Sequence, residues 1–302
     1  MGLLRSALVP CFLALTVASC GKSSGGAPAS PTAATAVTPT TTTTPATTTT
    51  IIPATVGPYT FSFSESTSAA DQQLIRDNVN FAHDFMQTTF GRTIQNATTI
   101  TTSTTAQGCS QGGSAAFTGL GAVTFCVANP GWMQPGPMNR QKIVIHELYH
   151  VLQFERRWTG QPQSITGPDW LIEGSAEVIG FLGMAQKGWV STDTARGCWT
   201  KEMSDFAVRQ PPGLPALNLL ESHQQFQTTI GPTYTVSSLA VDRLIAASGV
   251  RALNTFMDAA ASQTPSATSF TSAFGLSPTA FYDQFAAYRS ALTVPPAYLC
   301  GG

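Results

Sequence analysis

The spacing of apolar residues predicts a helix and then a small sheet in the first half of the folded part of the chain. Within Ser68–Phe90, apolar residues recur every three or four positions, which is typical of a helix with one buried face. Thr98–Thr105 is rich in β-branched residues that partly alternate, and this predicts a strand. Ala115–Pro130 fits either one strand or a hairpin that turns near Gly119 or Gly121.

The remainder of the chain is predicted to be helical. Gly131–Pro137 is a loop by composition, and Asn139 is suited to cap the helix that follows. Helices are predicted over Asn139–Trp158, Asp169–Ala185, Lys201–Val208, Thr235–Ala247, Val250–Ala261 and Pro278–Leu292. One helix, a small sheet and then mostly helices predict an α+β fold with a helical C-terminal half.

The first 56 residues do not have the pattern of a packed domain. Residues 1–19 contain Arg5 and then a short apolar run over Leu8–Val17, which is typical of a secretory signal and too short for a permanent membrane helix. Residues 20–56 are rich in Thr, Pro and small residues without apolar periodicity, which predicts a disordered tether. Residues 57–302 are therefore predicted to form the folded domain.

Composition narrows the range of partners. The chain of 302 residues has a net charge of −1, and only 10% of its residues are charged, against roughly 25% in typical soluble domains. This balance provides no electrostatic basis for binding nucleic acid. We expect a monomer without a nucleic-acid partner.

Cysteine usage predicts disulfides in the folded domain. Apart from Cys11 in the signal and Cys20, the chain has four cysteines, which are Cys109, Cys126, Cys198 and Cys300. An even number in an exported domain predicts two disulfides, with three possible pairings. We favour Cys109–Cys126 and Cys198–Cys300. Zinc binding by these cysteines is disfavoured because none of them forms a C-x-x-C pair.

The end of the predicted signal, Val17-Ala18-Ser19-Cys20, resembles the lipobox of bacterial lipoproteins. The resemblance implies cleavage before Cys20, acylation of that cysteine, and a lipid-anchored protein of the bacterial cell envelope that faces away from the cytoplasm. Gly21 and Lys22 provide no aspartate retention signal, which favours the outer membrane. The alternative is an ordinary signal peptide that ends near a cysteine.

The stretch HELYHVLQF, His146–Phe154, is a candidate metal-binding helix. His146 and His150 are four residues apart, so a helix places both imidazoles on one face, within reach of one metal ion. Glu147 lies beside them, where a carboxylate can act on a water rather than bind the metal. By composition H-E-x-x-H arises by chance in roughly one in a thousand such chains, and the alternative is a buried helix with satisfied histidines.

A second helix offers a third ligand. PDWLIEGSAEVIG, Pro168–Gly180, carries Glu173 and Glu177 four residues apart on one face of an apolar helix, where unpartnered carboxylates would be costly. Glu173 completes a His₂Glu set with an open fourth position, as catalytic zinc requires. Glu177 can accept the other ring N–H of a ligand histidine. The alternative is an ordinary solvated pair of glutamates.

HELYH followed by WLIEGSAE resembles the gluzincin branch of zinc metallopeptidases, including the bacterial peptidase MA-like group. The resemblance covers residues 143–180 well and 65–295 loosely, and no family feature is recognised around Cys109–Cys126. It implies a zincin-like domain that binds Zn²⁺ and hydrolyses a peptide or protein substrate. An endopeptidase is favoured, because no G-x-M-E-N stretch of the aminopeptidase type is present. His146, His150 and Glu173 match the metal ligands, Glu147 the general base and Glu177 the outer acid.

The resemblance also implies a substrate-binding edge strand and a donor for the oxyanion. The strand GAVTFCV would match the edge strand on which zincins lay an extended peptide. Tyr234 and His223 are the candidate donors, with Tyr234 preferred, although each can equally be a packing or surface residue. Two other functions stay open, which are a non-catalytic zinc-binding lipoprotein and zinc-dependent hydrolysis of another kind of bond.

Overall fold

The computed structural model describes residues 57–105, 109, 116–119, 121–133, 136–156, 167–209, 214–229, 232–262 and 266–292. All of them belong to the second of two units, Ile52–Gly302. The predicted signal and the whole predicted tether, with Cys20, lie outside the described residues, as does Cys300. Within the described part of the chain, no helix has the length and apolar character needed to cross a membrane.

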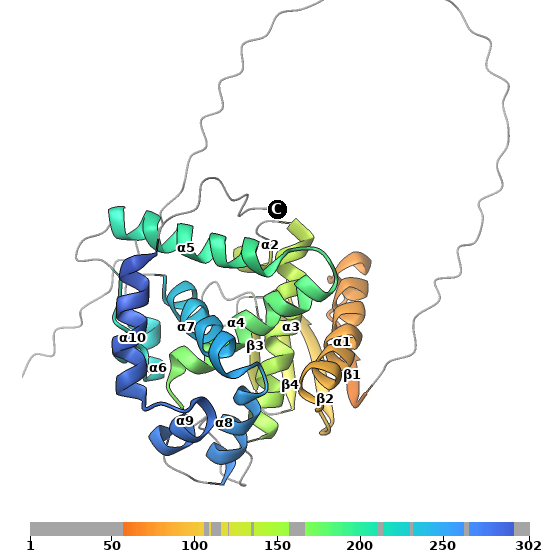
Figure 1. The fold of residues 1–302 in the computed structure, drawn as a ribbon. Coiled ribbons are helices and arrows are strands. Elements are labelled where there is room, and N and C mark those ends of the chain that lie inside the picture. Colours follow the sequence, from red (N-terminus) through yellow and green to blue (C-terminus); the bar gives the residue numbers. More distant parts are fainter. Residues whose placement is uncertain are drawn as a thin grey trace, which may run out of the picture. The chain divides into compact units, whose positions relative to one another are not determined.

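Among the described residues, the sheet has four strands in the order β1-β2-β4-β3 (Figure 1). The strands are β1 Tyr59–Ser62, β2 Thr98–Ser103, β3 Ala116–Gly119 and β4 Ala122–Cys126. β1, β2 and β4 are parallel, whereas β3 is antiparallel to β4. The hairpin interpretation of this region is therefore confirmed, and Gly121 adopts a positive φ of 63° in its turn.

One expectation about the sheet is wrong. The strand of GAVTFCV is β4, which pairs on both sides, with β2 and with β3. The edge strand near the candidate helix is β3. Strand order depends on pairing between distant segments, which local periodicity does not encode.

The helices account for most of the described residues, so the α+β prediction with a helical C-terminal half is confirmed. They are α1 Ala69–Phe90, α2 Pro130–Met133, α3 Gly136–Glu155, α4 Asp169–Gln186, α5 Thr192–Arg209, η1 Leu217–Leu220 (a 3₁₀ helix), α6 His223–Thr228, α7 Thr233–Ser248, α8 Ala252–Ala261, α9 Ser266–Phe274 and α10 Pro278–Ala291. α1 starts at the cap Ser68 and ends at Gly91 in the left-handed conformation.

Several helices differ from the prediction. α2 covers Pro130–Met133, which overlaps the segment Gly131–Pro137 that was predicted to be a loop. α3 begins at Gly136, so Asn139 lies inside the helix and is not its cap. α5 begins at Thr192 rather than Lys201, because Trp199 is buried against Phe181 with ring centroids 5.1 Å apart. α9 was not predicted, since its Ser- and Thr-rich sequence is a weak helix former that tertiary packing stabilises.

An aromatic cluster joins the C-terminal helices to the start of α4. Trp170 is fully buried, with its ring 5.6 Å from that of Phe281 and 6.2 Å from that of Phe270. Burial of such side chains is the main source of stability in a core. The cluster holds the first turn of α4, the helix that carries Glu173, against α9 and α10.

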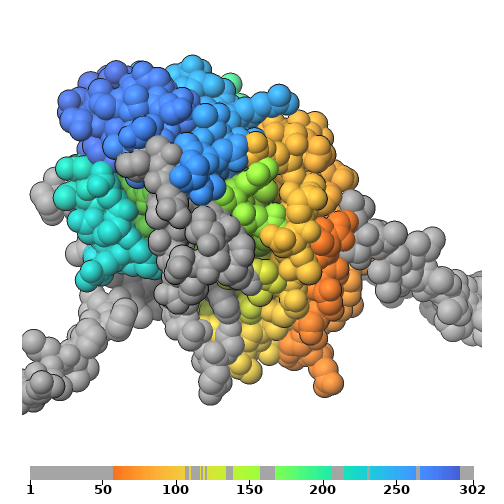
Figure 2. Space-filling model, turned by 90° about the horizontal axis from the view of Figure 1, so that it is seen from below, coloured from red at the N-terminus to blue at the C-terminus, as the bar shows by residue number. Residues whose placement is uncertain are grey.

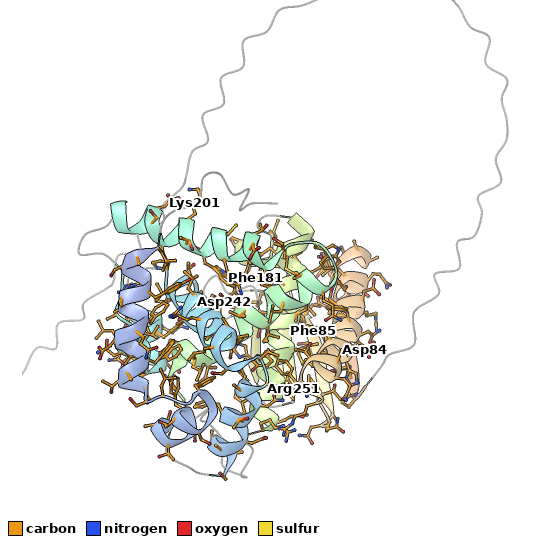
Figure 3. All side chains as sticks on the ribbon, in the orientation of Figure 1. Asp84, Phe85, Phe181, Lys201, Asp242 and Arg251 are labelled. Carbon is orange, nitrogen blue, oxygen red and sulfur yellow. A yellow bond between two sulfur atoms is a disulfide. The ribbon has the colours of Figure 1, made fainter. Side chains whose placement is uncertain are left out.

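Ion pairs connect elements that are far apart in sequence. Figure 2 shows the C-terminal helices beside α1, where Arg92, just after α1, donates two hydrogen bonds of 2.6 Å to Asp258 of α8. Figure 3 labels Asp242 on α7, whose carboxylate accepts hydrogen bonds of 2.7 and 2.9 Å from Arg196 of α5. Such bidentate pairs set the mutual orientation of the helices.

Close helix packing brings α3, α4 and α7 together in that order (Figure 1). Gly174 of α4 faces the backbone of Ser237 on α7, where an added Cβ would lie 2.6 Å from the Ser237 carbonyl oxygen. Gly180 faces Lys142 of α3, where an added Cβ would lie 3.0 Å from the Lys142 side chain. Glycine at these two positions lets the helices approach closely, which brings Glu173 towards α3.

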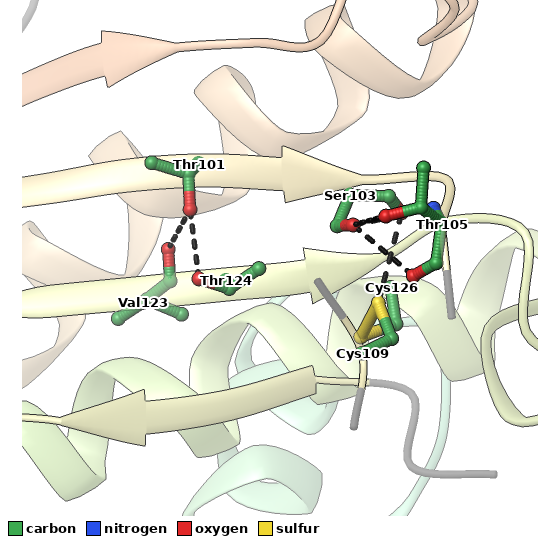
Figure 4. Close-up of a disulfide and its surroundings, with 7 residues drawn as sticks. All are labelled: Thr101, Ser103, Thr105, Cys109, Val123, Thr124 and Cys126. Carbon is green, nitrogen blue, oxygen red and sulfur yellow. Dashed lines mark hydrogen bonds between the residues drawn. A yellow bond between two sulfur atoms is a disulfide. The ribbon is translucent and has the colours of Figure 1, made fainter. Parts of the chain in front are cut away.

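A disulfide between Cys109 and Cys126 joins the segment after β2 to the end of β4 (Figure 4), as predicted. The two Cα atoms are 5.8 Å apart. Closing this loop stabilises the fold by about 3 kcal/mol in the chain-entropy model. Cys198 is also disulfide-bonded, and the predicted pairing with Cys300 stays a prediction because Cys300 lies outside the described residues.

Candidate metal centre

α3 and α4 place the three predicted ligands together. The Nε2 atoms of His146 and His150 are 3.0 Å apart, and Glu173 Oε2 lies 3.6 Å from the first and 3.4 Å from the second. The three ligand atoms all lie within 4.8 Å of one another, and both histidines are buried. The group can therefore hold one metal ion.

The opposite ring nitrogens show which atoms face the centre. His146 Nδ1 lies 3.1 Å from Glu177 Oε2, and His150 Nδ1 lies 2.7 Å from Gln153 Oε1. Because both partners are oxygen acceptors, each Nδ1 carries a proton when the ring is neutral, and each Nε2 presents its lone pair. Two nitrogen lone pairs and a carboxylate oxygen then converge, and such a set of acceptors can hold a cation between them.

The electrostatics of the two histidines are consistent with a cation at this place. Burial lowers the pKa of His146, but the neighbouring carboxylates of Glu173 and Glu177 outweigh it and raise that pKa to about 10. Burial is likewise outweighed at His150, whose pKa is raised by Glu173. Without a metal ion the cluster therefore attracts a proton to the place that a metal would take.

Glu177 is held between two cationic or proton-donating groups. Its Oε1 accepts a hydrogen bond from Lys142 Nζ, and its Oε2 faces His146 Nδ1. Burial raises the pKa of Glu177, but Lys142 and then His146 lower it to about 2 overall. Lys142 Nζ also lies 5.1 Å from the ring centroid of Phe181, and both members of the ion pair are largely buried.

Glu147 lies beside the three ligands and is hydrogen-bonded to the edge strand of the sheet. It is 8% exposed, and Thr118 of β3 donates a hydrogen bond of 2.5 Å to its Oε2. The Thr118 hydroxyl also lies 3.2 Å from the backbone carbonyl of Glu147. This contact orients one carboxylate oxygen and aligns the edge strand with the candidate base.

Tyr234 lies near the site, at the start of α7. Its side chain packs edge-on against Phe226 at 5.1 Å, and the residue is 43% exposed. Desolvation raises the pKa of Tyr234 strongly, and the negative charges of Glu173, Glu147 and Glu177 add to this. The tyrosine hydroxyl is therefore protonated at all ordinary pH values and available as a donor.

His223 begins α6 and pairs with the helix that carries Glu173. Its Nδ1 lies 2.9 Å from Asp169 Oδ2, one helical turn before Glu173, and its side chain is 73% exposed. Burial raises the pKa of Asp169, and its pairing with His223 opposes that rise. His223 thus lies at the periphery of the cluster.

Three residues at the site were not predicted from the sequence, which are Thr118, Lys142 and Gln153. Lys142 and Gln153 lie on α3 at helical spacing from the two histidines, four residues before His146 and three after His150. That spacing could have identified both. Thr118 reaches Glu147 through the sheet, and no local pattern indicates it.

Comparison with known proteins gives a partial match. The family model described as the eCIS core domain matches residues 80–157, which is less than half of the chain. The matched segment begins within α1, covers β2, β3 and β4, and runs to the end of α3. It includes His146, Glu147 and His150, whereas Glu173 lies beyond it. No curated protein matches the chain. Over residues 80–157 the chain is therefore similar to the eCIS core domain.

Proposed function

We propose that the folded domain is a zincin-like peptidase of the gluzincin type, in which His146, His150 and Glu173 bind zinc. The observation that carries the proposal is the placement of a buried, oriented glutamate beside a three-ligand site. A structural zinc site has four protein ligands and no use for such a base. Two imidazoles and one carboxylate are a donor set that suits zinc.

Glu147 is the proposed general base. Zinc, when bound, would lower the pKa of a water molecule and polarise the scissile carbonyl. The Thr118 hydroxyl binds Oε2 of Glu147, which leaves Oε1 to accept the proton of the attacking water. The same carboxyl group then delivers this proton to the nitrogen of the departing amine, so that the base is regenerated.

The carboxylate of Glu177, which is paired with Lys142, sets the orientation of the His146 ring. A carboxylate that accepts the Nδ1 proton fixes the ring and increases the electron density at Nε2. Because Lys142 compensates its charge, Glu177 remains ionised in a buried position. This arrangement supports the proposal that the two histidines form a metal-binding site and are not a chance occurrence of the motif.

The proposal is tested by hydrolysis of quenched fluorescent peptides with the purified chain. We expect hydrolysis that stops when the metal is removed with a chelator and returns when about one equivalent of zinc is added. Magnesium should not restore it, because imidazole ligands disfavour that ion. A chain that binds zinc in this way but cleaves no peptide would support the non-catalytic binding function instead.

Tyr234 is the proposed donor to the oxyanion, and Tyr234→Phe tests it. Loss of one such donor typically lowers kcat by about 10²–10³-fold, and we expect a decrease of that order with unchanged zinc content. His223→Ala is the comparison, because His223 is the other candidate and lies farther out, paired with Asp169. A full effect in His223→Ala and none in Tyr234→Phe would transfer the role to His223.

A further inference from the structure

The contacts of Gln153 point to a role that the proposed ligands alone do not explain. Gln153 is 3% exposed and lies one turn after His150 on α3, with its Oε1 2.7 Å from His150 Nδ1. We propose that Gln153 is a positioning residue that fixes the tautomer of His150 and couples it to the helix of the third ligand. This inference rests on the metal site of the proposed function.

The orientation of the Gln153 amide is determined by its other partners. Its Nε2 donates to the backbone carbonyl of Ile172 at 3.2 Å and to Ser175 Oγ at 2.9 Å. A carbonyl oxygen can only accept, and the Ser175 hydroxyl already donates its own proton to the same Ile172 carbonyl at 3.0 Å. The NH₂ group must therefore face α4, and the amide oxygen must face His150.

This orientation leaves one tautomer for a neutral His150. An amide oxygen accepts and cannot donate, so the proton of the ring must reside on Nδ1. Nε2 is then unprotonated and faces His146 Nε2 and Glu173 Oε2. In this tautomer the ring presents Nε2 to a metal ion without flipping.

Gln153 also connects the two halves of the metal site. Its two acceptors, Ile172 and Ser175, flank Glu173 on α4, so one amide joins the histidine of α3 to the backbone beside the carboxylate ligand. Displacement of α3 relative to α4 would break these bonds and move His150 and Glu173 apart. The amide therefore holds the spacing of the ligands as well as the tautomer.

The surroundings explain why an amide suits this position. A cavity lined mainly by apolar side chains adjoins Gln153 and Ser175, and residues such as Leu171, Leu253 and Phe256 form its walls. A carboxylate at position 153 could accept the His150 N–H, but its second oxygen would face the Ile172 carbonyl, which has no proton to donate. An apolar side chain would fit the space but would leave the His150 N–H unpaired.

Gln153→Met is the test, because methionine has a similar volume and forms no such hydrogen bonds. We expect the zinc dissociation constant, measured by competition with a chromophoric chelator, to rise by about 10–100-fold, as is typical for loss of an outer partner of a metal ligand. The visible absorption spectrum of the Co²⁺-loaded variant should also change, since it reports the geometry of the ligands. Gln72→Met is the matched control, because Gln72 donates one hydrogen bond to Thr67 far from the site.

If Gln153 only stabilised the fold, the same experiment would give a different result. If Gln153→Met lowered the melting temperature of the metal-free protein and kept the wild-type zinc affinity and Co²⁺ spectrum, the inference would be overturned. If this variant did not fold, Ser175→Ala would take its place, because it removes one of the two acceptors that orient the amide, and a smaller loss of affinity is expected. Wild-type protein that binds no zinc would overturn the metal site itself, whereas zinc-dependent hydrolysis with an unaffected Gln153→Met variant would overturn this inference alone.

Discussion

Glu147→Gln is expected to lower the rate of peptide hydrolysis by about 10²–10⁴-fold, the usual contribution of a general base, while zinc content stays at the wild-type level. The amide oxygen of glutamine can still accept the hydrogen bond from Thr118, so the local structure should persist. What is lost is the ability to take a proton from the attacking water. Steady-state kinetics and metal analysis of the same preparation measure both quantities.

The control for this variant is Glu155→Gln on the same helix. Glu155 lies two turns after Glu147 and accepts hydrogen bonds from the backbone N–H groups of Gln95 and Asn96, away from the metal centre. Its replacement removes one negative charge from α3 without changing the site, so hydrolysis should continue. Wild-type turnover in Glu147→Gln would remove Glu147 as the base.

Glu173→Ala is expected to weaken zinc binding by more than the ~10–100-fold that loss of an outer partner costs, because it removes one of three ligands. The two histidines that remain are one turn apart on α3 and cannot close the coordination sphere. Hydrolysis should be lost at the same time, at any zinc concentration that does not fill nonspecific sites. Equilibrium dialysis with zinc measures the affinity directly.

Two further variants separate ligation from packing in this experiment. Glu173→Gln preserves the volume of the side chain and removes only its charge, so a large loss of affinity there identifies a ligand rather than a cavity effect. Glu177→Gln changes an outer carboxylate on the same helix and should cause the smaller loss. Unchanged zinc content in Glu173→Ala would reject Glu173 as a ligand.

Glu177 makes the stability of the fold depend on pH. The pKa of Glu177 in the folded protein, about 2, lies below its ordinary value, so its pairing with Lys142 stabilises the fold above that ordinary value. This contribution is lost as the pH falls towards the folded pKa. The pair therefore stabilises the junction of α3 and α4 at neutral pH.

Much of the centre follows from helical periodicity. His146 and His150 face one way because they are four residues apart in a helix, and Glu173 and Glu177 do so for the same reason. An apolar sequence around two glutamates indicated that these carboxylates had partners. The ligands on each helix can therefore be predicted from the local sequence of that helix.

Other features depend on contacts between distant segments. The interior place of β4, the edge position of β3 and the contact of Thr118 with Glu147 arise from the pairing order of the strands, which can change without altering the local pattern. The earlier start of α5 and the presence of α9 reflect burial of aromatic side chains that overrides weak helix propensity.

Local order in the chain thus specifies which side chains share a helix face, since that depends only on 3.6 residues per turn. It also accounts for the α+β class, the paired cysteines of the sheet and the candidate ligands. The distance between the two helices is decided by tertiary packing, through Gly174 and Gly180 and the amide of Gln153, because close approach requires complementary surfaces from separate parts of the chain. That packing turns two separate motifs into a single site that can hold a metal ion.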